Sequence, residues 1–163
     1  RLIEINKIDL NAKNILLLGS GGASRAISVF LRDSSASFFV FNRTKDNLYK
    51  MLDDLSINSR LSFNQLDKSL KSQINMVINS LPASVDYTIL LKQLLPDVSK
   101  FNTIIDINYS PRERKINTER FIDGLDMFIF QAIKSNEIWM NKNISKAVDY
   151  SALKSFIQGK IKC

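Results

Sequence analysis

The chain has 163 residues, of which 45% are hydrophobic and 24% are charged, and its formal net charge at pH 7 is +7. This length and composition are typical of one globular domain, here residues 1–163, and exclude a disordered or fibrous protein. Every apolar run is too short to cross a bilayer, so no association with a membrane is expected.

The positive charge is compatible with two kinds of partner, nucleic acids and small phosphorylated molecules. Lys and Arg are scattered along the chain, and no basic segment carries the interleaved aromatic side chains that stack on bases. The sequence therefore favours a small phosphorylated ligand, and no nucleic acid.

Histidine is absent, and the single cysteine is Cys163, the last residue. An internal disulfide, a cysteine-based metal cage and a histidine base or ligand are therefore unavailable. We expect a cytoplasmic protein that holds no metal. The chain begins at Arg1 without an initiator Met, which indicates one domain of a longer polypeptide.

The first elements predicted along the chain are a strand, a tight turn and a helix. Ile15 to Leu18 form a fully apolar run, which is typical of a strand buried on both faces of a parallel sheet. Glycines then interrupt the pattern, and from Ala23 onward apolar residues recur at helical spacing. The run at 37–41 predicts a second strand, after which Thr44 is expected to cap a helix at 47–55.

Strands and helices continue to alternate through residue 124. Further strands are expected at 60–63, 75–80, 102–109 and 120–124, with a helix at 87–95. Repeated βα units of this length predict an α/β fold with a doubly wound, Rossmann-like parallel sheet of about six strands. Two C-terminal helices, at 125–140 and 145–161, are expected to complete the domain.

The stretch GSGGAS at 19–24 carries the spacing of a dinucleotide-binding turn. Gly19 permits a tight turn out of the strand, and Gly21 leaves the backbone N–H groups of the following helix open to a pyrophosphate. Ser24 holds the third position, where a small residue lets the helix pack closely. A glycine-rich connector without a ligand is the alternative, but the position between a buried strand and a helix favours dinucleotide binding.

The second predicted strand is followed by Asn42, where an NAD-binding domain presents an Asp or Glu to the ribose 2′-hydroxyl. A carboxylate would repel the 2′-phosphate of NADP, whereas Arg43 and Lys45 would attract it, and Asn42 and Thr44 can donate hydrogen bonds. The alternative is a helix start with a Thr cap and two solvated cations. Because cations at a helix start oppose the helix dipole, NADP binding is favoured.

Five motifs together resemble the C-terminal, NADP-binding domain of the shikimate dehydrogenase family. They are GSGGASRA at 19–26, NRT at 42–44, VINS at 77–80, DINYSP at 106–111 and DGLDMFIFQA at 123–132, in the family's order. The resemblance implies NADP as cofactor and the reversible reduction of 3-dehydroshikimate to shikimate with NADPH, a step of the shikimate pathway in aromatic amino-acid biosynthesis.

The resemblance also implies cofactor-binding and substrate-binding residues. The glycine turn would hold the pyrophosphate, the residues after the second strand the 2′-phosphate, and three further residues the nicotinamide. The pyrophosphate residues are Gly19, Ser20, Gly21, Gly22 and Ala23. The 2′-phosphate residues are Asn42, Arg43 and Thr44, with Lys45 nearby, and the nicotinamide residues are Ile107, Gly124 and Met127. Tyr109 and Gln131 would contact bound shikimate. The alternative is that Tyr109 is only a surface aromatic residue and Gln131 only a solvated polar residue of a helix.

Two positions depart from the family's pattern. Asn47 stands where many members have an Arg that stacks on adenine, which puts the adenine clamp in question. Asp126 stands where a glycine is frequent, on the first turn of a predicted helix, where a carboxylate suits the helix dipole.

The resemblance places the catalytic Lys and Asp in a separate N-terminal substrate domain that precedes these residues. No catalytic residue is therefore assigned within this chain, and the chain alone is expected to be inactive. Its expected partners are shikimate or 3-dehydroshikimate and that N-terminal domain. Two alternatives stay open: a related quinate/shikimate-type dehydrogenase, and a stand-alone module that binds NADP without catalysis.

Overall fold

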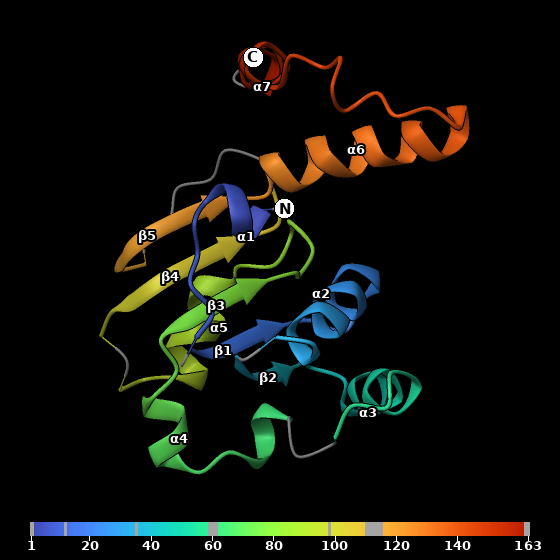
Figure 1. Cartoon of the computed structure of the whole chain (residues 1–163). Helices are drawn as coiled ribbons and strands as arrows, with labels where there is room; N and C mark the ends of the chain where they lie inside the picture. Colours follow the sequence, from blue (N-terminus) through green and yellow to red (C-terminus); the bar gives the residue numbers. More distant parts are fainter. Residues whose placement is uncertain are drawn as a thin grey trace.

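The computed structural model describes residues 2–11, 13–34, 36–58, 62–97, 99–109 and 116–161. Five strands in these residues form one sheet in the order β2-β1-β3-β4-β5, and every neighbouring pair is parallel (Figure 1). The strands are β1 (Asn14–Leu18), β2 (Ser37–Phe41), β3 (Met76–Asn79), β4 (Phe101–Asp106) and β5 (Thr118–Asp123). The predicted α/β class and parallel sheet are confirmed.

Helices cover both faces of the sheet and one of its ends. The elements are α1 (Leu2–Ile5), α2 (Gly22–Arg32), α3 (Lys45–Asp54), the 3₁₀ helix η2 (Phe63–Gln65), α4 (Lys68–Ser72), α5 (Tyr87–Leu94), α6 (Leu125–Met140) and α7 (Tyr150–Ile161). The bounds of α6 match the predicted helix, as β2 matches the predicted second strand.

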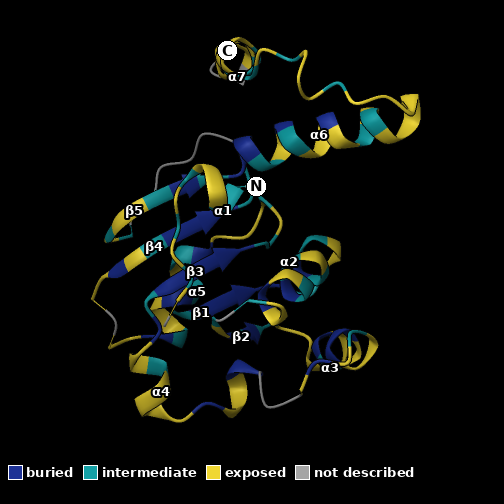
Figure 2. Cartoon of the chain, in the orientation of Figure 1, coloured by how far each residue is buried: buried dark blue, intermediate teal, exposed yellow. Residues whose placement is uncertain are grey.

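The core has two halves, one on each face of the sheet (Figure 2). Side chains alternate along β1, so Ile15 and Leu17 pack with α2 and α3, whereas Leu16 and Leu18 pack with α5. All four side chains are fully buried. This explains why β1 is an unbroken apolar run, since both faces of a central parallel strand are covered.

Residues 60 and 61 of the predicted strand at 60–63 lie outside the described residues, and the sheet formed by the described residues has five strands where about six were expected. Within the described part of this segment, Ser62 makes a single bridge to Val40, and Phe63 begins η2. The Phe63 ring is buried and meets Phe41 edge to face, with ring centroids 6.0 Å apart.

Two other elements are shorter than predicted, and side-chain carboxylates explain both. β4 ends at Asp106, because Asp106 Oδ1 accepts the backbone N–H of Asn108 at 3.0 Å and turns the chain. α7 begins at Tyr150, directly after Asp149, whose Oδ1 accepts the N–H of Ala152 at 3.0 Å. The Asp149 carboxylate thus satisfies one of the N–H groups that a helix start leaves unpaired.

Candidate functional site

The turn that follows β1 can be made only by glycine at position 19. Gly19 has φ +113°, a left-handed conformation that side chains rarely adopt, and its N–H donates to the Phe41 carbonyl at 2.8 Å. A Cβ atom there would lie 2.7 Å from Ser80 Oγ and 3.1 Å from Ser24 Oγ. The first glycine of the motif is thus required by conformation and by space.

Beneath the turn, Ser24 and Ser80 hold α2 against the end of β3. Their hydroxyl oxygens lie 2.5 Å apart, and Ser80 Oγ also donates to the Leu18 carbonyl at 2.6 Å. Because Ser80 has one hydroxyl hydrogen, Ser24 must donate to Ser80. Ser24 was predicted only as a small packing residue, so its hydrogen bond is a finding of the structure.

Gly21 and Gly22 leave the start of α2 open. Gly21 is the N-cap residue and supplies no side-chain cap, and nothing lies within 4 Å of a Cβ atom built at either glycine. The first N–H groups of a helix have no partner within the helix, so a pyrophosphate approaching here would meet unobstructed donors.

A groove of about 500 Å³ extends from the glycine turn across the carboxyl ends of β1, β2 and β3. The described residues that line it come from the turn, from α2 and α3, and from the segments after β2 and β3. They are Gly19, Ser20, Gly21, Arg25, Asn42, Asn47, Lys50, Ser80, Leu81 and Pro82. Ligands of open parallel sheets bind at such carboxyl ends, where the strand order reverses.

Two smaller hollows, of about 300 and 360 Å³, lie against α5 and contain none of the predicted site residues. One of them is lined by Phe101 and Asn117, at the amino ends of β4 and β5. Ligand sites of parallel sheets are not found at that end. The groove at the glycine turn is therefore the candidate cofactor site.

The structure places the four predicted 2′-phosphate residues at the junction of β2 and α3. Asn42 lines the groove, and its amide donates to the Thr44 carbonyl at 2.9 Å. Arg43, Thr44 and Lys45 are exposed beside it. Thr44 is the N-cap residue of α3, as predicted, although its side chain makes no capping hydrogen bond. Binding of a phosphate by these residues stays a prediction.

A buried polar network joins the segments that follow β3 and β4. Asp106 is 2% exposed, and its Oδ1 accepts hydrogen bonds from the side-chain amides of Asn79 at 3.0 Å and Asn108 at 2.8 Å. The Asn79 amide oxygen accepts from the Leu81 N–H at 3.2 Å, and the Asn108 amide donates to the Leu81 carbonyl at 3.1 Å. The network fixes the wall of the groove at Leu81 to the residues beside Ile107.

The predicted nicotinamide residues lie together where β4 and β5 end. The Gly124 N–H donates to the Asn108 carbonyl at 3.2 Å, and a Cβ atom built on Gly124 would overlap the Ile107 backbone. Met127 follows on the first turn of α6 and is partly buried. The structure thus brings Ile107, Gly124 and Met127 into one region, outside the set of residues that line the groove.

Tyr109 packs against α6, the helix that carries Gln131. The Tyr109 ring packs against Phe128 on α6, with centroids 4.7 Å apart and an interplanar angle of 31°. Gln131 is three residues beyond Phe128, so both project from the same face of the helix. Tyr109 and Gln131 are exposed, as residues that contact a substrate from one side of a cleft would be.

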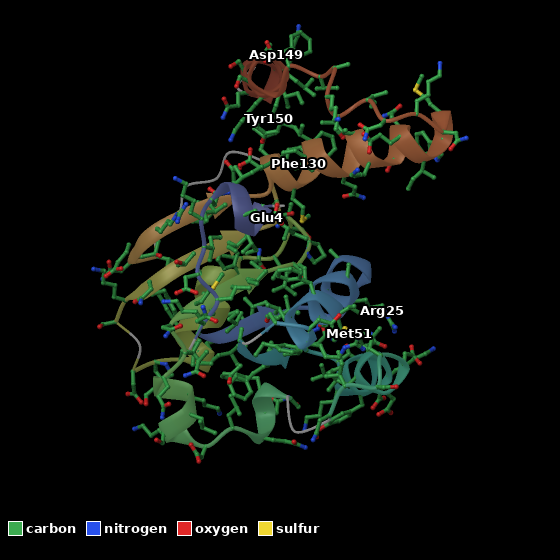
Figure 3. The ribbon with its side chains drawn as sticks, in the orientation of Figure 1. Glu4, Arg25, Met51, Phe130, Asp149 and Tyr150 are labelled. Carbon is green, nitrogen blue, oxygen red and sulfur yellow. The ribbon has the colours of Figure 1, made fainter. Side chains whose placement is uncertain are left out.

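Asp126, next to Met127, ties α7 to α6. Its side chain is 8% exposed and pairs with Lys154 at 2.5 Å, and Tyr150 donates a hydrogen bond to the same oxygen. Burial alone would raise the pKa of Asp126, but hydrogen bonds from Lys154 and Tyr150, with the charge of Lys154, lower it. Tyr150 also stacks on Phe130 with centroids 4.8 Å apart (Figure 3).

Burial and the hydrogen bond to Asp126 also shift the pKa of the Tyr150 hydroxyl. Its burial, followed by its hydrogen bond to the Asp126 carboxylate, raises the pKa of the Tyr150 hydroxyl, which therefore stays protonated as a donor. No sequence motif predicts this contact, because Tyr150 and Lys154 lie on a helix separate from the one that carries Asp126.

Metal-binding and membrane-spanning features are not found in the described residues. No group of three or more Asp, Glu or Cys side chains there is arranged to hold a metal ion. No described helix combines the length and the apolar character that crossing a bilayer requires.

Arg25, Lys50 and Ser80 line the groove but were not predicted as site residues. Arg25 and Ser80 fall inside the quoted motifs, which is the one signal that could have found them. Lys50 carries no motif, and only the packing of α3 beside α2 brings it to the groove.

No family model matches the chain. The chain is 29% identical over 159 residues to a shikimate dehydrogenase (NADP(+)) of Clostridium perfringens strain SM101, covering 91% of this chain and 57% of the relative. It is 27% identical over 152 residues to the enzyme of that name from Methanococcoides burtonii, and the match covers 87% of this chain and 55% of that relative. The chain therefore spans little more than half the length of these curated relatives.

Solved structures show the same similarity. Shikimate dehydrogenase 1 from Peptoclostridium difficile has a TM-score of 0.61 and 25% identity, over 99% of this chain and 57% of that one. A chorismate mutase/shikimate 5-dehydrogenase fusion protein from Clostridium acetobutylicum has the same fold, with a TM-score of 0.66 and 20% identity over 99% and 60%. The resemblance predicted from the five motifs is confirmed: the chain is similar, over nearly its whole length, to little more than half of proteins named shikimate dehydrogenase.

Proposed function

We propose that the chain binds NADP in the groove at the glycine turn and forms the cofactor-binding half of an NADP-dependent shikimate dehydrogenase. The observation that carries this proposal is the groove itself, which joins the open start of α2 to Asn42 at the carboxyl ends of parallel strands. The curated relatives are named as NADP(+) enzymes, which supports the choice of cofactor.

The chemistry of the groove fits the dinucleotide. Gly21 and Gly22 leave room for a pyrophosphate at the first N–H groups of α2. None of the described residues that line the groove is Asp or Glu, whereas Arg25 and Lys50 are cationic and Asn42 carries amide donors. A phosphate ester on the ribose is therefore favoured over a free 2′-hydroxyl.

The chain's own residues position the reacting groups. Ile107, Gly124 and Met127 hold the nicotinamide at the ends of β4 and β5, while Tyr109 and Gln131 orient the substrate from the adjoining face of α6. When bound, NADPH supplies a hydride to the carbonyl carbon of 3-dehydroshikimate. The position of the nicotinamide ring determines the rate of hydride transfer, because the reacting atoms must approach to about 3–3.5 Å.

The remaining parts of the enzyme belong to the other half of the polypeptide. An N-terminal substrate domain would close the cleft and supply the group that transfers the proton. The chain's coverage of only 57% of the Clostridium perfringens relative supports such a domain. We propose a cytoplasmic location for the full polypeptide, because this chain has a single cysteine. We expect this chain alone to show no turnover.

Calorimetric titration of the chain with NADPH and NADH tests the proposal. NADPH should bind about ten- to a hundredfold more tightly, which is the effect of losing hydrogen bonds to a charged group. Gly21→Val should abolish binding of both cofactors and leave the circular dichroism spectrum unchanged, since its Cβ atom meets nothing within 4 Å. Equal affinities for the two cofactors, or normal binding by the valine variant, would contradict the proposal.

A further inference from the structure

The cations that line the groove are not the ones that follow β2. Arg25 on α2 and Lys50 on α3 line it, whereas Arg43 and Lys45 are exposed beside it. Lys50 is three residues after Asn47, about 4.5 Å along the helix axis, and both residues therefore lie on the same face of α3.

The two cations of the groove differ in their pairing. Arg25 Nη2 lies 2.9 Å from Asp54 Oδ2, so its charge is compensated by a carboxylate of α3. Lys50 makes no ion pair with any residue of the described ranges, although α3 also carries Asp46, Asp53 and Asp54. Lys50 is thus the uncompensated positive charge of the groove.

Resting on the proposed function, we infer that Lys50 is a specificity-determining residue that binds the 2′-phosphate of NADP. Its ammonium group, on a flexible four-carbon stem, supplies positive charge to this phosphate. Asn42 and Asn47 line the same groove and carry amide donors that suit a phosphate. Lys50 thus adds to the site a cation that favours NADP, three residues further along α3 than Asn47.

Replacing Lys50 by Gln tests this inference, with Lys92→Gln as the matched control. Both substitutions remove one positive charge from an exposed helical lysine, but Lys92 lies on α5, on the opposite face of the sheet. Lys50→Gln should weaken NADPH binding about tenfold and change NADH binding less than twofold. Lys50→Arg should keep the preference, and Lys92→Gln should change neither affinity.

Ligands that contain only the adenosine part of NADP test whether Lys50 contacts that part of the cofactor. Lys50→Gln should weaken the binding of adenosine 2′,5′-bisphosphate but not that of AMP, and the loss should shrink as salt is raised. A merely structural role of Lys50 would weaken both probes and lower the unfolding temperature.

The outcomes separate this inference from the proposed function. If the unaltered chain prefers NADPH and Lys50→Gln leaves that preference intact, or lowers both affinities equally, the inference is overturned and the proposed function stands. If the unaltered chain binds neither cofactor, both are overturned. Selective loss of NADPH affinity, with rescue by Lys50→Arg, supports the assignment.

Discussion

Gly124 lies so close to Ile107 that a Cβ atom on Gly124 would sit 1.8 Å from the Ile107 carbonyl oxygen and 2.3 Å from its carbonyl carbon. The obstacle is backbone, which cannot swing aside as the end of a flexible side chain can. The Gly124 N–H also donates to the next carbonyl, that of Asn108. The start of α6 is therefore held against the end of β4 at a distance that only glycine permits.

Gly124→Ala should accordingly destabilise the domain. Forcing extra atoms into a packed site costs about 1–3 kcal/mol. The matched control is Gly159→Ala on α7, where a Cβ atom meets nothing within 4 Å and should stabilise the helix by up to about 1 kcal/mol. Chemical denaturation of the two variants measures the difference, and equal stabilities would show that the β4 and β5 ends can separate freely.

Arg43→Asp should erase the preference for NADPH over NADH. The substitution places a carboxylate beside Asn42, where it would repel a 2′-phosphate and accept a hydrogen bond from a free 2′-hydroxyl. The control is Lys142→Asp, which makes the same change of charge in the exposed segment between α6 and α7. Titration with both cofactors measures the ratio of affinities, and an unaltered ratio would place Arg43 outside the phosphate site.

Hydrophobic periodicity in the sequence was sufficient to predict an element where burial of that element's own apolar side chains determines its structure. The apolar run of β1 and the helical spacing of α6 needed no knowledge of partners, and both elements formed as predicted. The motif glycines also predicted the tight turn after β1, because Gly19 has a backbone conformation that few other residues adopt.

Predictions failed where a contact that hydrophobic periodicity does not show changed the result. β4 ends earlier than predicted, where Asp106 accepts the backbone N–H of Asn108, and α7 begins later than predicted, where Asp149 accepts the backbone N–H of Ala152. The position of Lys50 in the groove likewise depends on how α3 packs beside α2, which no local spacing reveals. Contacts of this kind are set by tertiary packing rather than by sequence periodicity.

The attachment of α7 should weaken in acid. A carboxyl group whose pKa is lowered by folding contributes stability above its unfolded value, about 3.8 for Asp126, and loses that contribution as the pH falls through the lower folded pKa. The protection factors of the α7 amides, which correct exchange for the intrinsic effect of pH, should therefore fall below pH 3.8, more steeply than those of the sheet.

Asp126→Asn tests the cause of this acid sensitivity. The variant should exchange faster in α7 at neutral pH, because Lys154 loses its buried partner, and should lose the additional fall in protection in acid. Tyr150→Phe keeps the stacking on Phe130 and should produce a smaller effect. An unchanged acid response in the Asn variant would assign the sensitivity to another carboxylate.

The 163-residue chain should show no turnover. It can hold a hydride donor, but Tyr109 and Gln131 could orient a substrate only from one side, and no group in the chain is assigned to the proton. Shikimate-dependent reduction of NADP⁺, followed by absorbance, should be undetectable for this chain and present for one extended upstream by a substrate domain. Appreciable turnover by the short chain would show that a catalytic group lies within it.

Trp139 is the chain's single tryptophan, and it lies 79% exposed near the end of α6, remote from the sheet. Its emission in the folded domain should therefore already be that of an indole in water. Melting of the hydrophobic core would change that emission little, so intrinsic fluorescence would underestimate unfolding that far-ultraviolet spectra detect. The same exposure makes Trp139 a local probe, because a protein surface covering the end of α6 would shift its emission to the blue while the sheet remains unaltered.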